Sequence, residues 1–248
     1  MSSAPQSVIE IHGLTRAFGG LVAVNDLGFS VAPGEILGLL GPNGSGKTTA
    51  LNLMSGLLRP DAGSIRLNGQ NIAGLASYKI ARLGLARTFQ LVRVLDGMNC
   101  RENIEAGIAF HWPHISASAT SDRIDQLLQR VGLRGHDQRP AADLTYIDRK
   151  RLELARALAS KPSLLLLDEW LAGLNPSELS IGIDLIRSLR DEGATIILVE
   201  HVMAAVRALC DRCVVMSSGR KIAEGATADV LSDAAVVKAY LGGVAADA

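Results

Sequence analysis

One segment constrains the fold more than any other: residues 41–48, which read GPNGSGKT. They match the pattern G-x-x-x-x-G-K-[ST] and lie between an apolar run, 36–40, and a helix that we predict over 47–58. A glycine-rich loop in this place lets backbone N–H groups and the positive end of the helix dipole surround a phosphate. The segment therefore predicts an α/β fold and a site for a nucleoside triphosphate.

The side chains of this loop indicate how the phosphates and a metal ion are held. We expect Lys47 to reach the β- and γ-phosphates as a point charge, and the Thr48 hydroxyl to bind Mg²⁺ with Thr49 behind it. Other residues of the loop are expected to surround the phosphates. They are Asn43, Gly44, Ser45 and Gly46.

A second apolar run, 164–167, is followed by two acids, Asp168 and Glu169. A carboxylate at the carboxyl end of a parallel strand, beside a phosphate loop, can hold Mg²⁺, and we assign that role to Asp168. Glu169 is then placed to accept a proton from an attacking water. The phosphate loop and the acid pair are two parts of one hydrolytic mechanism, which predicts an ATPase.

Short apolar runs alternate with helix-like segments, as in a parallel sheet covered by helices. Between 96 and 160 the strand signals vanish and apolar residues recur at helical spacing, which predicts an inserted helical subdomain. The other predicted strands span 8–11, 27–31, 64–67, 195–199 and 213–216, and the other predicted helices span 177–189, 202–209 and 234–241.

Charge and hydropathy exclude several classes of protein. Lys and Arg number 25, as do Asp and Glu, so the chain lacks the basic surplus of a nucleic-acid binder. Hydrophobic residues make up 48% of the chain, but no apolar run approaches the 18–20 residues of a membrane span. The start, MSSAPQSVIE, lacks the basic and apolar regions of a signal peptide, so we expect a cytoplasmic protein.

Two short patterns resemble metal or redox motifs, and in both cases the structural interpretation is favoured. Cys210 and Cys213 lie where a helix ends and an apolar strand begins, and no second ligand pair follows them. His111 and His114 have an HxxH spacing, but Pro113 disrupts the helix that would align the two imidazoles.

Five motifs occur in an order that identifies a family. They are GPNGSGKTT (41–49), Gln90 after ARTF, LTYIDRKRLELARAL (144–158), LLLLDE (164–169) and VEH (199–201). This order resembles the ATPase subunits of ABC transporters from Val8 to Gly243. Four further segments resemble the ATP-binding subunits of branched-chain amino-acid importers: FGGLVAVNDL (18–27), RTFQ (87–90), AGLNP (172–176) and KAYLGG (238–243).

The resemblance implies a fold and its boundaries. We expect an α/β P-loop NTPase (RecA-like) core, an N-terminal antiparallel β subdomain and an inserted helical subdomain. The ATPase domain would span 6–243, with 6–95 and 161–243 as the core and 96–160 as the helical subdomain, between flexible ends at 1–5 and 244–248.

The resemblance also implies roles for four residues that their spacing alone does not assign. Phe18 would stack on adenine, and Gln90 would touch Mg²⁺ and the attacking water. His201 would hydrogen-bond the γ-phosphate. Thr145, in the signature segment, would contact the γ-phosphate of a nucleotide bound to a second ATPase subunit.

In this family two ATPase domains face each other, and hydrolysis moves attached membrane helices. The implied partners are a second ATPase subunit, two transmembrane permease subunits and, indirectly, an external solute-binding protein, which places the chain on the inner face of the cell membrane. LVRVL (91–95) would meet the permease. We therefore expect an importer subunit for branched-chain amino acids or similar solutes; an ATPase for lipopolysaccharide-type export and a soluble ABC ATPase of translation or repair are the alternatives.

Two positions depart from the family pattern. Ile147 replaces a glycine of the signature segment, and Trp170 stands where proline usually follows the acid pair. Losing one preorganised donor to developing charge typically costs about 2.7–4 kcal/mol. A further hypothesis is therefore that the chain is a slow, asymmetric half of a heterodimer.

Overall fold

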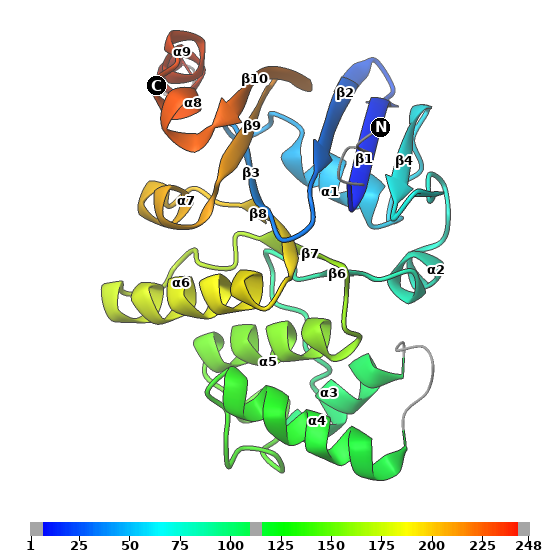
Figure 1. The fold of residues 1–248 in the computed structure, drawn as a ribbon, viewed down its shortest axis with the longest axis vertical. Coiled ribbons are helices and arrows are strands. Elements are labelled where there is room, and N and C mark those ends of the chain that lie inside the picture. Colours follow the sequence, from blue (N-terminus) through cyan, green and yellow to red (C-terminus); the bar gives the residue numbers. More distant parts are fainter. Residues whose placement is uncertain (1–6, 110–115, 243–248) are drawn as a thin grey trace, which may run out of the picture.

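The centre of the fold is a six-stranded sheet in the order β10-β9-β3-β8-β7-β6. The computed structural model describes residues 7–109 and 116–242 (Figure 1). The strands from β9 to β6 are parallel, and β10 is an antiparallel edge strand. Their bounds are β3 Ile36–Leu40, β6 Leu85–Arg87, β7 Leu164–Asp168, β8 Thr195–Val199, β9 Arg212–Ser217 and β10 Arg220–Ala226.

Both faces of this sheet are buried, which is why its strands read as continuous apolar runs. Successive side chains of a strand point to opposite faces. On β3, Ile36 and Leu40 join a core with the helices of one face, whereas Leu37 and Leu39 join a core on the other face. That second core includes α1 (Lys47–Met54) and the antiparallel sheet.

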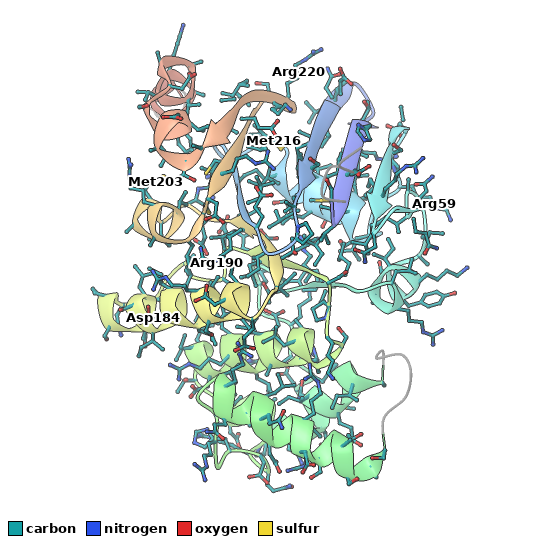
Figure 2. All side chains as sticks on the ribbon, in the orientation of Figure 1. Arg59, Asp184, Arg190, Met203, Met216 and Arg220 are labelled. Atoms are coloured by element: carbon teal, nitrogen blue, oxygen red, sulfur yellow. The ribbon has the colours of Figure 1, made fainter. Side chains whose placement is uncertain are left out.

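The antiparallel sheet has the order β2-β1-β4-β5, so the predicted N-terminal antiparallel β structure is confirmed. Its strands are longer than the apolar runs that predicted them, because the strand ends carry exposed and polar side chains. Met216 of β9, labelled in Figure 2, belongs to the core that this sheet shares with α1. The bounds are β1 Ile9–Phe18, β2 Leu21–Val31, β4 Ala62–Leu67 and β5 Gln70–Asn71.

Three α-helices occupy the described part of the segment that was predicted to be helical, and they form the lower part of Figure 1. The first begins at a capping box, in which Asn99 and Glu102 exchange side-chain and backbone hydrogen bonds. The three helices pack against one another, whereas the exact domain boundaries at 96 and 160 stay a prediction. They are α3 Cys100–Ile108, α4 Ala117–Arg130 and α5 Tyr146–Ala159.

Several elements differ from the sequence prediction. The helix predicted over 47–58 ends at Met54, because Gly56 adopts a left-handed φ of 72° where a Cβ would lie 2.6 Å from the Leu75 carbonyl oxygen. Strands β6 and β10 and two short helices, α2 (Ser77–Arg82) and α8 (Thr227–Ser232), were not predicted. The remaining helices are α6 Pro176–Asp191, α7 Met203–Leu209 and α9 Ala234–Gly242.

The parallel strands bring four segments of the chain to one edge of the sheet. Strand β3 leads into the phosphate loop, β8 into 200–201, β7 into Glu169, and β6 into 88–90. Ligands of open α/β sheets bind at this carboxyl edge. No helix among residues 7–109 and 116–242 combines the length and apolar character of a membrane span.

Candidate functional site

The phosphate loop requires glycine at two positions, because a Cβ there would collide with a backbone carbonyl group. Gly41 has a φ of 144°, and a Cβ there would lie 2.1 Å from the Met216 carbonyl oxygen. Gly46 has a φ of 103°, and its Cβ would lie 2.3 Å from the Ala23 carbonyl oxygen. Only glycine allows the backbone to follow this path without displacing the neighbouring strands.

Lys47, the first residue of α1, is buried inside the loop. Its Nζ donates hydrogen bonds to the carbonyl oxygens of Gly41 at 2.7 Å and Pro42 at 3.0 Å. Burial lowers the pKa of this ammonium below its ordinary value, although the carboxylates of Glu169 and Asp168 oppose the shift. A buried cation that has only carbonyl partners is suited to bind phosphate oxygens.

The rest of the loop fits a nucleotide phosphate chain. The Ser45 hydroxyl oxygen is buried and has no hydrogen-bond partner among the described residues. The first N–H groups of a helix such as α1 lack partners within the helix. Asn43, Gly44 and Thr48 lie on the exposed side of the loop. An unpartnered polar atom, a buried cation and a glycine-lined backbone together form an anion site.

Three residues that were assigned to hydrolysis come together in the structure, where Gln90 and His201 both contact Glu169. Glu169 Oε2 accepts a hydrogen bond from Gln90 Nε2 at 2.9 Å, and Glu169 Oε1 lies 3.0 Å from His201 Nε2. Each residue follows a different strand of the sheet: Gln90 follows β6, Glu169 follows β7 and His201 follows β8. The Glu169 carboxylate is thus held between an amide and an imidazole, at the edge of the sheet where the phosphate loop also lies.

Asp168, the predicted Mg²⁺ ligand, has a partner that the sequence analysis did not assign. Its Oδ2 accepts a hydrogen bond from the Arg87 guanidinium at 2.8 Å, and both side chains are buried. Arg87 also donates to Asn52 Oδ1 at 2.7 Å and to Ser55 Oγ at 3.1 Å, which ties β6 to α1. The signal was present in the sequence, since an arginine precedes Gln90 by three residues, but β6 was too short to predict.

A second missed residue is Glu200, which separates β8 from His201. Its Oε1 accepts a hydrogen bond from the Leu171 N–H at 2.6 Å, and its Oε2 is buried without a partner among the described residues. Burial raises the pKa of Glu200 to about 7, against the lowering effects of the Leu171 N–H and of the Lys150 charge.

The signature segment forms the beginning of α5. Thr145 is the N-cap: its Oγ1 accepts from the Asp148 N–H at 3.3 Å and donates to Asp148 Oδ2 at 2.8 Å. The threonine is exposed and engages its own helix, not Glu169 or the phosphate loop.

The two positions that depart from the family pattern are neighbours in space. Ile147 and Trp170 both line a cavity of about 140 Å³ between α5 and α6. Gly182 of α6 faces the same cavity, and a Cβ there would lie 3.2 Å from Trp170 Cζ3 and 2.6 Å from Leu171 Cδ2. The Trp170 indole therefore packs against α6 at Gly182, where a larger side chain would collide with it.

Phe18, predicted to stack on adenine, lies at the end of β1 with 43% of its surface exposed. The Arg16 guanidinium lies over the ring, 4.9 Å from its centroid. An exposed aromatic face is available for stacking.

Of the two motifs that were interpreted as structural, the structure describes the cysteine pair but not the HxxH segment. Cys210 directly follows α7 and Cys213 lies in β9, and both are buried free thiols. Residues 111–114, with the HxxH spacing, lie outside the described residues.

A groove of about 420 Å³ separates α2 and β6 from the helical segment. Arg87, Phe89, Leu95 and Glu153 are among its lining residues. Beside it, Leu91 is 81% exposed, and Leu95 and Met98 are also exposed. Large apolar side chains are therefore exposed in and next to 91–95, the segment that the resemblance assigned to permease contact.

Known families and proteins resemble this chain over most of its length. Residues 24–172 match the family described as "ABC transporter", and residues 220–246 match the family described as "Branched-chain amino acid ATP-binding cassette transporter". The chain is 39% identical to the high-affinity branched-chain amino acid transport ATP-binding protein LivG of Escherichia coli, over 96% of this chain and 98% of LivG. It is 38% identical to BraF of Pseudomonas aeruginosa, a protein of the same description, over 95% of this chain and 98% of BraF.

Solved structures resemble the fold throughout. The ADP conformation of MJ1267, an ATP-binding cassette of an ABC transporter, superimposes with a TM-score of 0.83 at 28% identity, covering 95% of this chain and 99% of MJ1267. The cbiO1 subunit from Clostridium perfringens, described as part of the transporter complex cbiONQ, has a TM-score of 0.80 at 26% identity and covers 94% of each chain. The predicted α/β fold is confirmed by these similarities.

Proposed function

The chain belongs to the ABC transporter family, and from this premise we propose that it is the ATP-hydrolysing subunit of an importer for branched-chain amino acids or similar small solutes. The observation that carries the catalytic part is the Glu169 carboxylate, held between Gln90 and His201 beside the phosphate loop. The solute class is supported by the similarity to LivG and BraF over nearly the whole chain and by the match at residues 220–246.

Nucleotide binding relies on the phosphate loop. Lys47 exchanges its carbonyl partners for β- and γ-phosphate oxygens, and the N–H groups at the start of α1 bind the same anion. Ser45 gains a partner for its buried hydroxyl. Phe18 offers its exposed ring to the adenine.

Three side chains have the oxygen chemistry that Mg²⁺ prefers: Thr48, Gln90 and Asp168. When bound, the ion neutralises the charge that develops on the phosphate oxygens. Arg87 holds Asp168 in place through Oδ2, so that the carboxylate stays fixed at the end of β7.

Hydrolysis requires a base at the attacking water. Glu169 accepts the proton of the water as the oxygen attacks the γ-phosphorus and the bond to the β–γ bridging oxygen breaks. Gln90 orients the water and the carboxylate, and His201 donates a hydrogen bond to the γ-phosphate.

Assembly with other subunits completes the proposal. A second ATPase subunit would present its phosphate loop to Thr145, which lies exposed at the start of α5. The groove beside Leu91 and Leu95 has the apolar character of a docking surface for a permease segment. The chain would thus work as a peripheral protein on the inner face of the membrane.

Solute uptake tests this function. Cells that lack their own copy of the gene should take up radiolabelled leucine when supplied with the chain, and should fail to do so with Lys47→Ala, which cannot hold the phosphates. Uptake of another solute class, with leucine uptake unchanged, contradicts the solute assignment. Purification with ribosomes or DNA instead of membrane subunits contradicts the transport role.

A further inference from the structure

The backbone that carries Glu169 is held by two buried ionisable residues to which the hydrolytic mechanism assigns no role. Glu169 has a φ of 51°, a left-handed conformation that non-glycine residues adopt at a cost. Such a conformation persists when the surrounding structure fixes it. Residues 169–172 therefore need partners, and they find them on two other elements.

Lys150 of α5 supplies the first set of partners. Its ammonium donates to the carbonyl oxygens of Ala172 at 2.7 Å and Trp170 at 3.0 Å, and it lies 3.4 Å from that of Glu169. The side chain is only 1% exposed, and the Tyr146 ring covers the ammonium at 5.2 Å. A buried cation is stabilised by such convergent carbonyl groups, and here they come from one turn of backbone.

The link between α5 and this turn is reciprocal. The Trp170 indole N–H donates to the Lys150 carbonyl oxygen at 3.1 Å, while the Lys150 ammonium donates to the Trp170 carbonyl oxygen. The indole, in turn, packs against Gly182 of α6. Trp170 thus has a structural reason to stand at this position.

Glu200 supplies the remaining partner. The Leu171 N–H, which lies between the carbonyl groups held by Lys150, donates to Glu200 Oε1 at 2.6 Å. Because Glu200 adjoins His201, the same turn is tied to the residue whose imidazole contacts the Glu169 carboxylate. Lys150 of α5 therefore binds the carbonyl groups of the turn, and Glu200, which follows β8, binds its Leu171 N–H.

We propose that Lys150 and Glu200 are positioning residues that hold the turn 169–172 so that the Glu169 carboxylate stays between Gln90 and His201. Neither side chain touches the reacting atoms. This inference rests on the proposed role of Glu169 as general base.

A double-mutant cycle tests the proposal in the full chain, isolated with the membrane subunits that co-purify with it. Lys150→Met keeps the length of the side chain and removes its donors. We expect kcat for MgATP to fall about 10- to 100-fold, the usual effect of a displacement near 1 Å, with KM changed less than about threefold. Lys150→Arg should restore part of kcat, and Lys79→Met, an exposed lysine of α2, should leave kcat unchanged.

The decisive comparison uses a Glu169→Gln background and single-turnover hydrolysis of radiolabelled ATP. If Lys150 acts through Glu169, Lys150→Met should lower this residual rate less than about threefold, because the group that it positions is already lost. An equal fold-loss in both backgrounds, or a folded Lys150→Met protein with wild-type kcat, overturns the proposal.

If Lys150→Met does not fold, Trp170→Phe provides a second test of the same contact, since it removes the indole N–H donor and keeps an aromatic ring at this position. It should also lower kcat in the wild-type background and not in the Glu169→Gln background; equal losses again overturn the proposal. If Glu169→Gln itself hydrolyses ATP at the wild-type rate, the role of Glu169 fails first, and the two failures are thereby distinguished.

Discussion

Glu169 combines two properties at the scale of a single residue: a left-handed backbone and a carboxylate with two side-chain partners. Backbone strain of this kind concentrates at functional sites. The position of the side chain is therefore set by contacts that are remote in sequence, from β6, β8 and α5. Substituting a residue that makes one of these contacts should lower turnover more than it lowers the affinity for nucleotide.

Burial of Glu200 predicts a pH-dependent stability. Its pKa is raised from 4.5 to about 7 in the folded chain, so the folded state binds a proton that the unfolded state has already released between these values. The stabilising contribution is complete below about pH 4.5 and is lost as the pH rises through about 7. Its size is on the order of 3 kcal/mol.

Chemical denaturation at several pH values checks this prediction. The free energy of unfolding of the wild type, relative to Glu200→Gln, should decline between pH 5 and pH 7.5 and then level off. Glu105→Gln, an exposed carboxyl group on α3, serves as the control and should show no such decline. A difference between wild type and Glu200→Gln that does not vary with pH argues against the raised pKa.

Residues whose chemistry depends on neighbours in sequence were predictable. Lys47, Asp168 and Glu169 were assigned from a loop and a strand end, whereas Gln90 and His201 needed the family resemblance. Lys150 and Glu200 could not be predicted, because their importance arises from burial against a turn that is distant in sequence. A lysine in an amphipathic helix is ordinarily a solvated residue.

At the scale of elements, α9 contacts the start of the phosphate loop. The Gly41 N–H donates to the Tyr240 hydroxyl oxygen at 2.9 Å, so the C-terminal helix satisfies a backbone donor at the start of the loop. Burial raises the pKa of this hydroxyl above its ordinary value. The segment KAYLG thus has a structural role that its sequence alone did not reveal.

Tyr240→Phe isolates this contact. It leaves the Gly41 N–H without its acceptor, and we expect the free energy of unfolding to fall by about 1–3 kcal/mol. Tyr78→Phe, at an exposed tyrosine of α2, should change it by less than about 0.5 kcal/mol. Equal stability of the two variants in urea denaturation excludes a supporting role for α9.

The strands that were predicted best are those buried on both faces. Strands β3 and β8 begin and end where the apolar runs do, because both faces of the sheet require apolar side chains. Strand β10 was missed because most of its residues are exposed and charged residues interrupt its apolar ones, and β6 because it has only three residues. Their pairing comes from neighbouring strands, which a local pattern does not report.

At the scale of the whole molecule, the proposed pairing with a second ATPase subunit gives the signature segment a role in hydrolysis. Ile147 stands in the segment that would face a partner's nucleotide, and its side chain lines the cavity beside Trp170. The hypothesis of a slow half-site predicts that Ile147→Gly raises kcat of the assembled transporter, by about 100- to 1,000-fold for one fully restored donor. Ile147→Ala controls for the lost packing; an unchanged kcat in Ile147→Gly contradicts the hypothesis.

The proposed role of Glu169 as the base of an ATP-hydrolysing transporter subunit can be tested directly by one measurement. ATP binding and hydrolysis are compared in wild type and Glu169→Gln, a change that keeps the size of the side chain and removes its basicity. We predict that turnover falls about 10²- to 10⁴-fold while ATP binds with its wild-type affinity. Hydrolysis by Glu169→Gln at close to the wild-type rate would contradict the role of Glu169 as general base.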